Sequence, residues 1–168
     1  MSSYFFSSLT HLTDTGPLEK GAYIAILHAD KIPPHIGWLY NGSYFSLKAN
    51  GKDFALPIHK LIAILKAKNI KSLFVEVQDS SNFIHTKSIF EQTALQHPND
   101  TCLVPIKQLF PNLIKQRKVE KVAHLLALLA DNQQIKKVYA LGMISDTFKL
   151  PEYGADEILA RILLVQQK

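Results

Sequence analysis

The sequence predicts an α+β fold in which an N-terminal antiparallel β meander packs against helices and the C-terminal portion is rich in helix. Three observations predict it. Apolar runs of strand length follow one another before Pro57, an Asn-Gly pair separates two of them, and helical periodicity begins after Pro57. The 168 residues, 47% of them hydrophobic, suit one compact core, so we expect a single domain over residues 1–168.

The strands of the meander are predicted by apolar and aromatic runs. Ala22–Leu27 is almost entirely apolar, which is typical of a buried strand. Asn41-Gly42 lies between the runs Ile36–Tyr40 and Ser43–Lys48. This arrangement predicts a hairpin, because a type I′ turn needs a positive φ at both central residues. A second turn, Asn50-Gly51, leads into a further short strand.

The residues on either side of the meander carry other signals. Residues 1–15 are rich in Ser and Thr, and we expect them to be loosely ordered. Pro57 suits the first turn of a helix, and after it apolar side chains recur at helical spacing in several segments. The predicted elements are a helix from Pro57 to near Asn69, a strand at Lys71–Val77, a helix at Lys87–Gln96, a turn at His97–Asp100, a helix at Val119–Asp131, a strand at Ile135–Leu141 and a helix at Ala155–Gln166.

Charge, hydropathy and cysteine content limit the partners. The 19 Lys and Arg against 14 acids give a net charge of +5, but only two of these cations are arginines, the side chain best suited to bidentate phosphate contacts. The basic stretch Lys107–Lys121 has the spacing of a solvated helix face, so we do not expect nucleic acid binding. Leu125–Ala130, the longest apolar run, is too short for a transmembrane segment. A single cysteine excludes an intrachain disulfide and favours the reducing cytoplasm.

We expect neither a metal nor a nucleotide cofactor. The seven histidines and Cys102 are scattered over different predicted elements, without the Cys pairs or His-x3-His spacing of zinc sites. The seven glycines form neither G-x-G-x-x-G nor a phosphate-binding loop, and no serine lies in a G-x-S-x-G motif. The chemistry that remains is that of a cysteine paired with a histidine.

Cys102 and His35 are the candidate catalytic residues. Cys102 follows Asn99–Thr101, a run typical of helix N-caps, and a helix N-terminus would lower the pKa of the thiol. The same segment also fits a strand in which Cys102 is a small buried side chain. His35 follows two prolines at the start of a strand, and Gly37 lets another group approach the backbone there. The alternative is that His35 caps the strand in solvent.

The aromatic side chains of the hairpin are the candidate substrate-binding residues. If the hairpin lines a cleft, Trp38 and Tyr44 contact the substrate. If helices cover the hairpin, these rings belong to the core. An uncovered hairpin would also suit a binding role with no chemistry.

Two segments, Lys20–Leu27 and His35–Leu47, resemble the opening of the circularly permuted papain-like hydrolases, the NlpC-related family that includes lecithin:retinol acyltransferase. In that family the histidine precedes the cysteine, as His35 precedes Cys102 here. The resemblance implies that His35 is the general base, Cys102 is the nucleophile and Ser46 orients the imidazole, with backbone amides beside the cysteine as the oxyanion hole. The relatives carry a second histidine at the position of Ser46, and a serine cannot stabilise an imidazolium by charge.

We therefore expect a cysteine-dependent hydrolase or acyltransferase that acts on an amide or ester bond of a small-molecule or peptide substrate. The alternative is a non-catalytic domain that binds a ligand or a protein. The first function requires Cys102 and His35 to face one groove, whereas the second does not.

Overall fold

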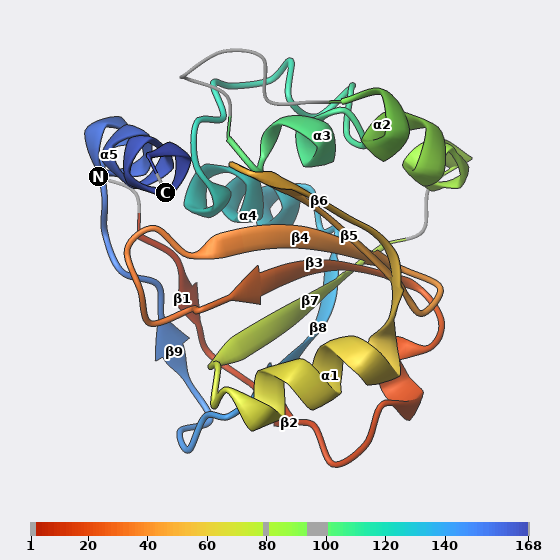
Figure 1. Ribbon diagram of the computed structural model, residues 1–168. Coiled ribbons are helices and arrows are strands. Elements are labelled where there is room, and N and C mark those ends of the chain that lie inside the picture. Colours follow the sequence, from red (N-terminus) through yellow and green to blue (C-terminus); the bar gives the residue numbers. More distant parts are fainter. Residues whose placement is uncertain (1–2, 79–80, 94–100, 168) are drawn as a thin grey trace.

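The computed structural model describes residues 3–78, 81–93 and 101–167 and confirms the α+β fold (Figure 1). Seven strands form one mixed sheet in the order β2-β8-β7-β3-β4-β5-β6, and β1 pairs separately with β9. The strands are β1 (Phe5–Phe6), β2 (Thr10–His11), β3 (Ala22–Leu27), β4 (His35–Tyr40), β5 (Ser43–Lys48), β6 (Gly51–Pro57), β7 (Ser72–Val77), β8 (Ile135–Leu141) and β9 (Phe148–Lys149). The helices are α1 (Ile58–Ala67), α2 (Thr86–Gln92), α3 (Val104–Lys107), α4 (Val122–Asp131) and α5 (Ala155–Gln166), with 3-10 turns at Gly16–Leu18 and Ser81–His85.

The antiparallel meander predicted for the N-terminal third is confirmed. Strands β3, β4, β5 and β6 are neighbours in this order, each antiparallel to the next. The β4–β5 hairpin turns through Asn41 and Gly42, whose φ angles of 48° and 78° have the positive sign that a type I′ turn requires. The pairing of β4 with β5 ends at Trp38 opposite Phe45, which leaves the first residues of β4 without partners in β5.

Residues 1–15, which we expected to be loosely ordered, contain two short strands. Strand β2 pairs parallel with β8, with Thr10 opposite Tyr139, and β1 pairs antiparallel with β9, with Phe6 opposite Phe148. Each of these strands is two residues long. That length is too short to produce the alternation by which a strand is recognised in sequence. The C-terminal portion is only partly helical, because β8 and β9 lie between α4 and α5.

The core consists of two apolar layers, one on each face of the sheet. Side chains alternate along β3, so Ile24 and Ile26 pack in the layer of α2, α3 and α4, whereas Tyr23 and Leu27 pack in the layer of α1. Every residue of β3 is buried. A central strand covered on both faces explains why this segment reads as a continuous apolar run.

Two helix boundaries differ from the prediction by three residues or more. Helix α2 ends at Gln92 rather than Gln96, and residues 94–100, with the predicted turn at His97–Asp100, lie outside the described residues. Helix α4 begins at Val122 because Lys121 has extended backbone angles (φ −144°, ψ 164°). Among the described residues, no helix is long and apolar enough to cross a membrane.

Candidate functional site

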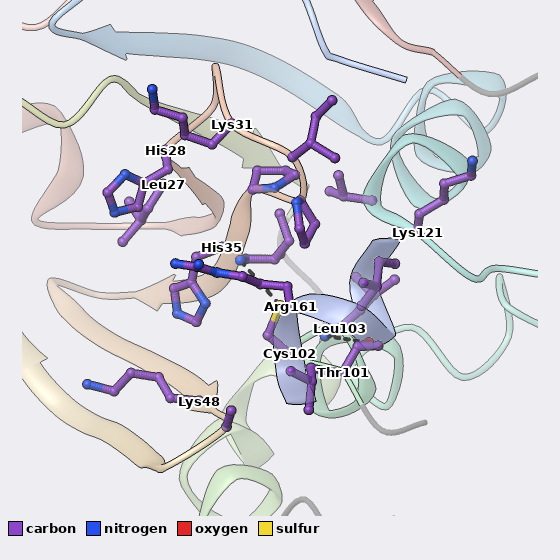
Figure 2. A pocket seen from close by; sticks show the side chains of 18 of the residues that line it. Leu27, His28, Lys31, His35, Lys48, Thr101, Cys102, Leu103, Lys121 and Arg161 are labelled. Carbon is purple, nitrogen blue, oxygen red and sulfur yellow. Dashed lines mark hydrogen bonds between the residues drawn. The ribbon is translucent and has the colours of Figure 1, made fainter. Parts of the chain in front are cut away.

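A cavity of about 700 Å³ lies where the pairing of β4 with β5 ends (Figure 2). Its walls come from the β3–β4 connection, the β5–β6 turn, the segment before α3, the start of α4, and α5. Ligand-binding cavities are typically roughly 300–1,000 Å³ in volume. Two of the predicted catalytic residues, His35 and Cys102, line this cavity, so the fold brings them to one site from distant parts of the chain.

Cys102 lies in the segment before α3 and is half-buried. Its Sγ accepts a hydrogen bond of 3.4 Å from the backbone N–H of Ile36, a residue of β4 beyond the β5 pairing. Burial raises the pKa of the Cys102 thiol, and the Ile36 hydrogen bond opposes this shift. We had expected a helix N-terminus to lower this pKa, but α3 begins only at Val104 and is four residues long.

His35 is the first residue of β4 and is half-buried. Its Nε2 atom is buried and has no hydrogen-bond partner, and no hydrogen bond joins the imidazole to the Cys102 sulfur among the described residues. Burial lowers the pKa of His35 to about 4, although the Asp53 carboxylate acts in the opposite direction. At neutral pH the site therefore holds a neutral thiol and a neutral imidazole rather than an ion pair.

Ser46 contacts a carboxylate instead of the imidazole. Its hydroxyl is fully buried and donates a hydrogen bond of 2.9 Å to Asp53 Oδ2. Lys48 Nζ donates to Asp53 Oδ1 at 3.1 Å, so the carboxylate is held from two sides. Asp53 also acts on the charge state of His35, which makes it a member of the site that the sequence analysis missed. Ser46 and Asp53 face each other across the β5–β6 hairpin, in a register that the structure provides.

The backbone amides expected to form an oxyanion hole already have partners. The N–H of Leu103 donates to Thr101 Oγ1 at 3.3 Å. The N–H of Val104 donates to the carbonyl oxygen of Thr101 at 3.0 Å. These two amides would stabilise an oxyanion only after their bonds to Thr101 break.

The two rings predicted to contact substrate, Trp38 and Tyr44, are fully buried and do not line the cavity. Trp38 Nε1 donates to Thr86 Oγ1 at 3.1 Å, and its ring packs edge-on against Phe83. The Tyr44 ring lies over Gly37, where a Cβ atom would overlap it. The group that approaches the backbone at Gly37 is therefore the ring of Tyr44, which belongs to the protein itself.

Other residues of the cavity had no signal in the sequence. Arg161 reaches the cavity from α5, and Tyr153 from the segment before that helix. Both are brought there by tertiary packing, which local patterns do not report. Among the described residues, no group of three or more His, Cys, Asp or Glu side chains could hold a metal ion.

Comparison with known proteins finds no matching family model, no matching curated protein and no matching solved structure. The likeness of Lys20–Leu27 and His35–Leu47 to the permuted papain-like hydrolases is thus a resemblance of short segments. The chemistry of the cavity has to be argued from its own residues.

Proposed function

We propose that this chain is a cysteine-dependent hydrolase or acyltransferase of the permuted papain-like type, with Cys102 as nucleophile and His35 as general base. One observation carries the proposal. The Cys102 sulfur is hydrogen-bonded to the amide of Ile36, the residue next to His35, and both side chains line the same cavity. This bond places the sulfur against the backbone of the strand end that carries His35.

The reaction would proceed in two steps. The Cys102 sulfur attacks the carbonyl carbon of an amide or ester while the thiol proton passes to the neutral imidazole of His35. The imidazolium then gives this proton to the leaving amine or alcohol, and a thioester remains on Cys102. Water, or an acceptor alcohol or amine, attacks the thioester with its proton passing to His35. The acyl product leaves, and the thiol regains its proton.

Asp53 supplies the charge that Ser46 lacks. An imidazolium forms during the reaction, and a nearby carboxylate stabilises it more than a hydroxyl does. The Asp53 carboxylate opposes the lowering of the His35 pKa by burial, and it is held by Ser46 and Lys48. In the proposed function, Asp53 stabilises the imidazolium by its charge, and Ser46 holds the Asp53 carboxylate in place.

The neutral thiol and the neutral imidazole fit the proposed function if the substrate binds before the Cys102 thiol loses its proton. Burial disfavours both the thiolate and the imidazolium in the empty cavity. The proton transfer between them is then coupled to attack on the bound carbonyl group. A free thiol is required throughout, which suits the reducing cytoplasm.

The test is the formation of an acyl-enzyme with p-nitrophenyl acetate, followed by intact-protein mass spectrometry and peptide mapping. Wild-type protein is expected to gain one acetyl group on Cys102, and Cys102→Ser to gain none there. His35→Ala is expected to slow acylation by roughly 100-fold, the size of a general-base effect. His59→Ala is the matched control, because His59 is an exposed residue of α1, which covers the other layer of the core. Equal rates in His35→Ala and His59→Ala would contradict the proposal.

A second candidate is ligand binding without chemistry. The observation that favours it is the neutral state of the Cys102 thiol and of the His35 imidazole, which are not hydrogen-bonded to each other within the described part of the chain. In this case the cavity binds small molecules reversibly, and wild-type protein forms no acyl-enzyme. The same acylation assay therefore separates the two functions.

A further inference from the structure

The cavity has a strongly basic lining. Four cationic side chains line it, and Glu120 is the one acid among the described lining residues. The carboxylate of Glu120 is 2.8 Å from Lys118 Nζ, and Lys118 is not part of the lining. The cationic residues are Lys31, Lys48, Lys121 and Arg161.

These cations differ in how far they are already paired. Lys48 is bound to Asp53, and Lys121 donates to the carbonyl oxygen of Tyr153 and lies over its ring at 5.5 Å. The one acid that Lys31 contacts among the described residues is Asp30, at a long distance of 3.9 Å. Within the part of the chain that the structure describes, Arg161 makes no ion pair. Arg161 and Lys31 are therefore the cations most available to a ligand.

Most of the basic groups lie on one side of the cavity in the view of Figure 2. Figure 2 shows Lys31, Arg161 and Lys48 on the same side of the view as His28 and His35, with Lys121 on the opposite side. The buried, unpartnered Nε2 of His35 belongs to this side. Such an arrangement presents a localised positive potential to a small solute rather than a uniformly charged wall.

The rest of the wall is apolar. Helix α5 contributes Ile158, Ile162 and Val165, and Ile32 and Leu47 contribute from the β3–β4 connection and from β5. Apolar walls with a few polar groups at one side are typical of sites that bind amphiphilic small molecules.

We propose that the cavity binds a small organic anion with a carboxylate head and an apolar body, the carboxylate lying against Arg161. The planar guanidinium of Arg161 can hold a carboxylate through two parallel hydrogen bonds. The apolar body lies against α5. This inference deepens the proposed function. The binding of the anion does not depend on that function. The identity of the substrates, apolar amides or esters that carry a free carboxylate, rests on it.

The test measures binding in a Cys102→Ser protein, which cannot form an acyl-enzyme. Isothermal titration calorimetry compares octanoate, octanamide and octylammonium, which share one apolar chain and differ in charge. We expect octanoate to bind at least tenfold more tightly than octanamide, and octylammonium to bind most weakly. Added salt is expected to weaken the binding of octanoate and not that of octanamide.

Two variants locate the head-group site. Arg161→Gln is expected to weaken octanoate binding about tenfold and to leave octanamide binding unchanged. Lys60→Gln, which removes one positive charge from the exposed surface of α1, is the control and is expected to change neither. Equal binding of octanoate and octanamide, absence of binding by all three, or an equal effect of the two variants would overturn the inference.

The outcome is independent of the acylation assay. Octanoate binding that depends on Arg161, together with no acyl-enzyme in the wild-type protein, supports this inference and contradicts the proposed chemistry. Acylation that depends on His35, without preference for the anion, supports the chemistry and overturns the inference.

Discussion

At the scale of single residues, the proposed function depends on the protonation of His35. The Nε2 atom of His35 is buried without a hydrogen-bond partner, and burial removes hydration from the charged form of the imidazole, so its pKa falls to about 4. The Asp53 carboxylate limits this fall. The residue is thus held neutral, as a general base must be, at the cost of being a weak one.

This shift makes the stability of the fold depend on pH. Between pH 6.5, the ordinary pKa of histidine, and about pH 4, the unfolded chain binds a proton that the native His35 does not. The free energy of unfolding therefore falls as the pH is lowered through this window, by roughly 3 kcal/mol for a shift of this size. Urea denaturation at several pH values measures this change in the free energy of unfolding. His35→Asn is expected to lose less stability on acidification than wild type, and His59→Asn to lose as much as wild type. Parallel curves for His35→Asn and wild type would show that His35 does not titrate as argued.

At the scale of elements, β4 and β5 share one tightly packed contact. Gly37 and Tyr44 come from the two strands of the hairpin, and the ring takes the space of the missing side chain. The backbone pairing of β4 with β5 ends at Trp38 and Phe45, next to this contact, and the cavity begins there. The Gly37–Tyr44 contact therefore fixes the strand end on which His35 lies.

Gly37→Ala is expected to destabilise the protein by about 1–3 kcal/mol, because its methyl group would overlap the Tyr44 ring. Tyr44→Leu removes the overlapping ring atoms. In the double variant the two losses should therefore be less than additive, which a double-mutant cycle of unfolding free energies detects. Strict additivity would mean that the two residues do not contact each other.

The elements also show what the sequence could predict. Ala22–Leu27, Ser43–Lys48 and Ile135–Leu141 were predicted with the boundaries that the structure has, because each is an apolar or β-branched run bounded by turn residues. The two-residue strands β1, β2 and β9 were missed, since pairing rather than pattern defines them. In the candidate site, only cross-strand register brings Asp53 to Ser46, and only helix packing brings Arg161 to the cavity.

At the scale of the whole molecule, the cavity is a product of the complete fold. The sheet provides His35, the segment before α3 provides Cys102, and α5 provides Arg161 and apolar wall. The net charge of +5, which appeared in the sequence as a surplus of lysines, becomes meaningful where several cations line one cavity with a single acid among its described residues. The proposed chemistry and the proposed charge selection thus share one site.

The proposed function requires His35 to take the proton of Cys102 during acyl transfer, and the pH dependence of acylation measures whether it does. Acylation of Cys102 by p-nitrophenyl acetate is followed by mass spectrometry from acid to alkaline pH in wild type and His35→Ala. Because His35 is already neutral above its pKa of about 4, the rate of acylation in the wild type is expected to be level between about pH 6 and pH 8. Without His35 the rate should follow the thiolate and rise about tenfold per pH unit over that range. Parallel profiles that rise with pH in both proteins would show that His35 does not take the proton of Cys102.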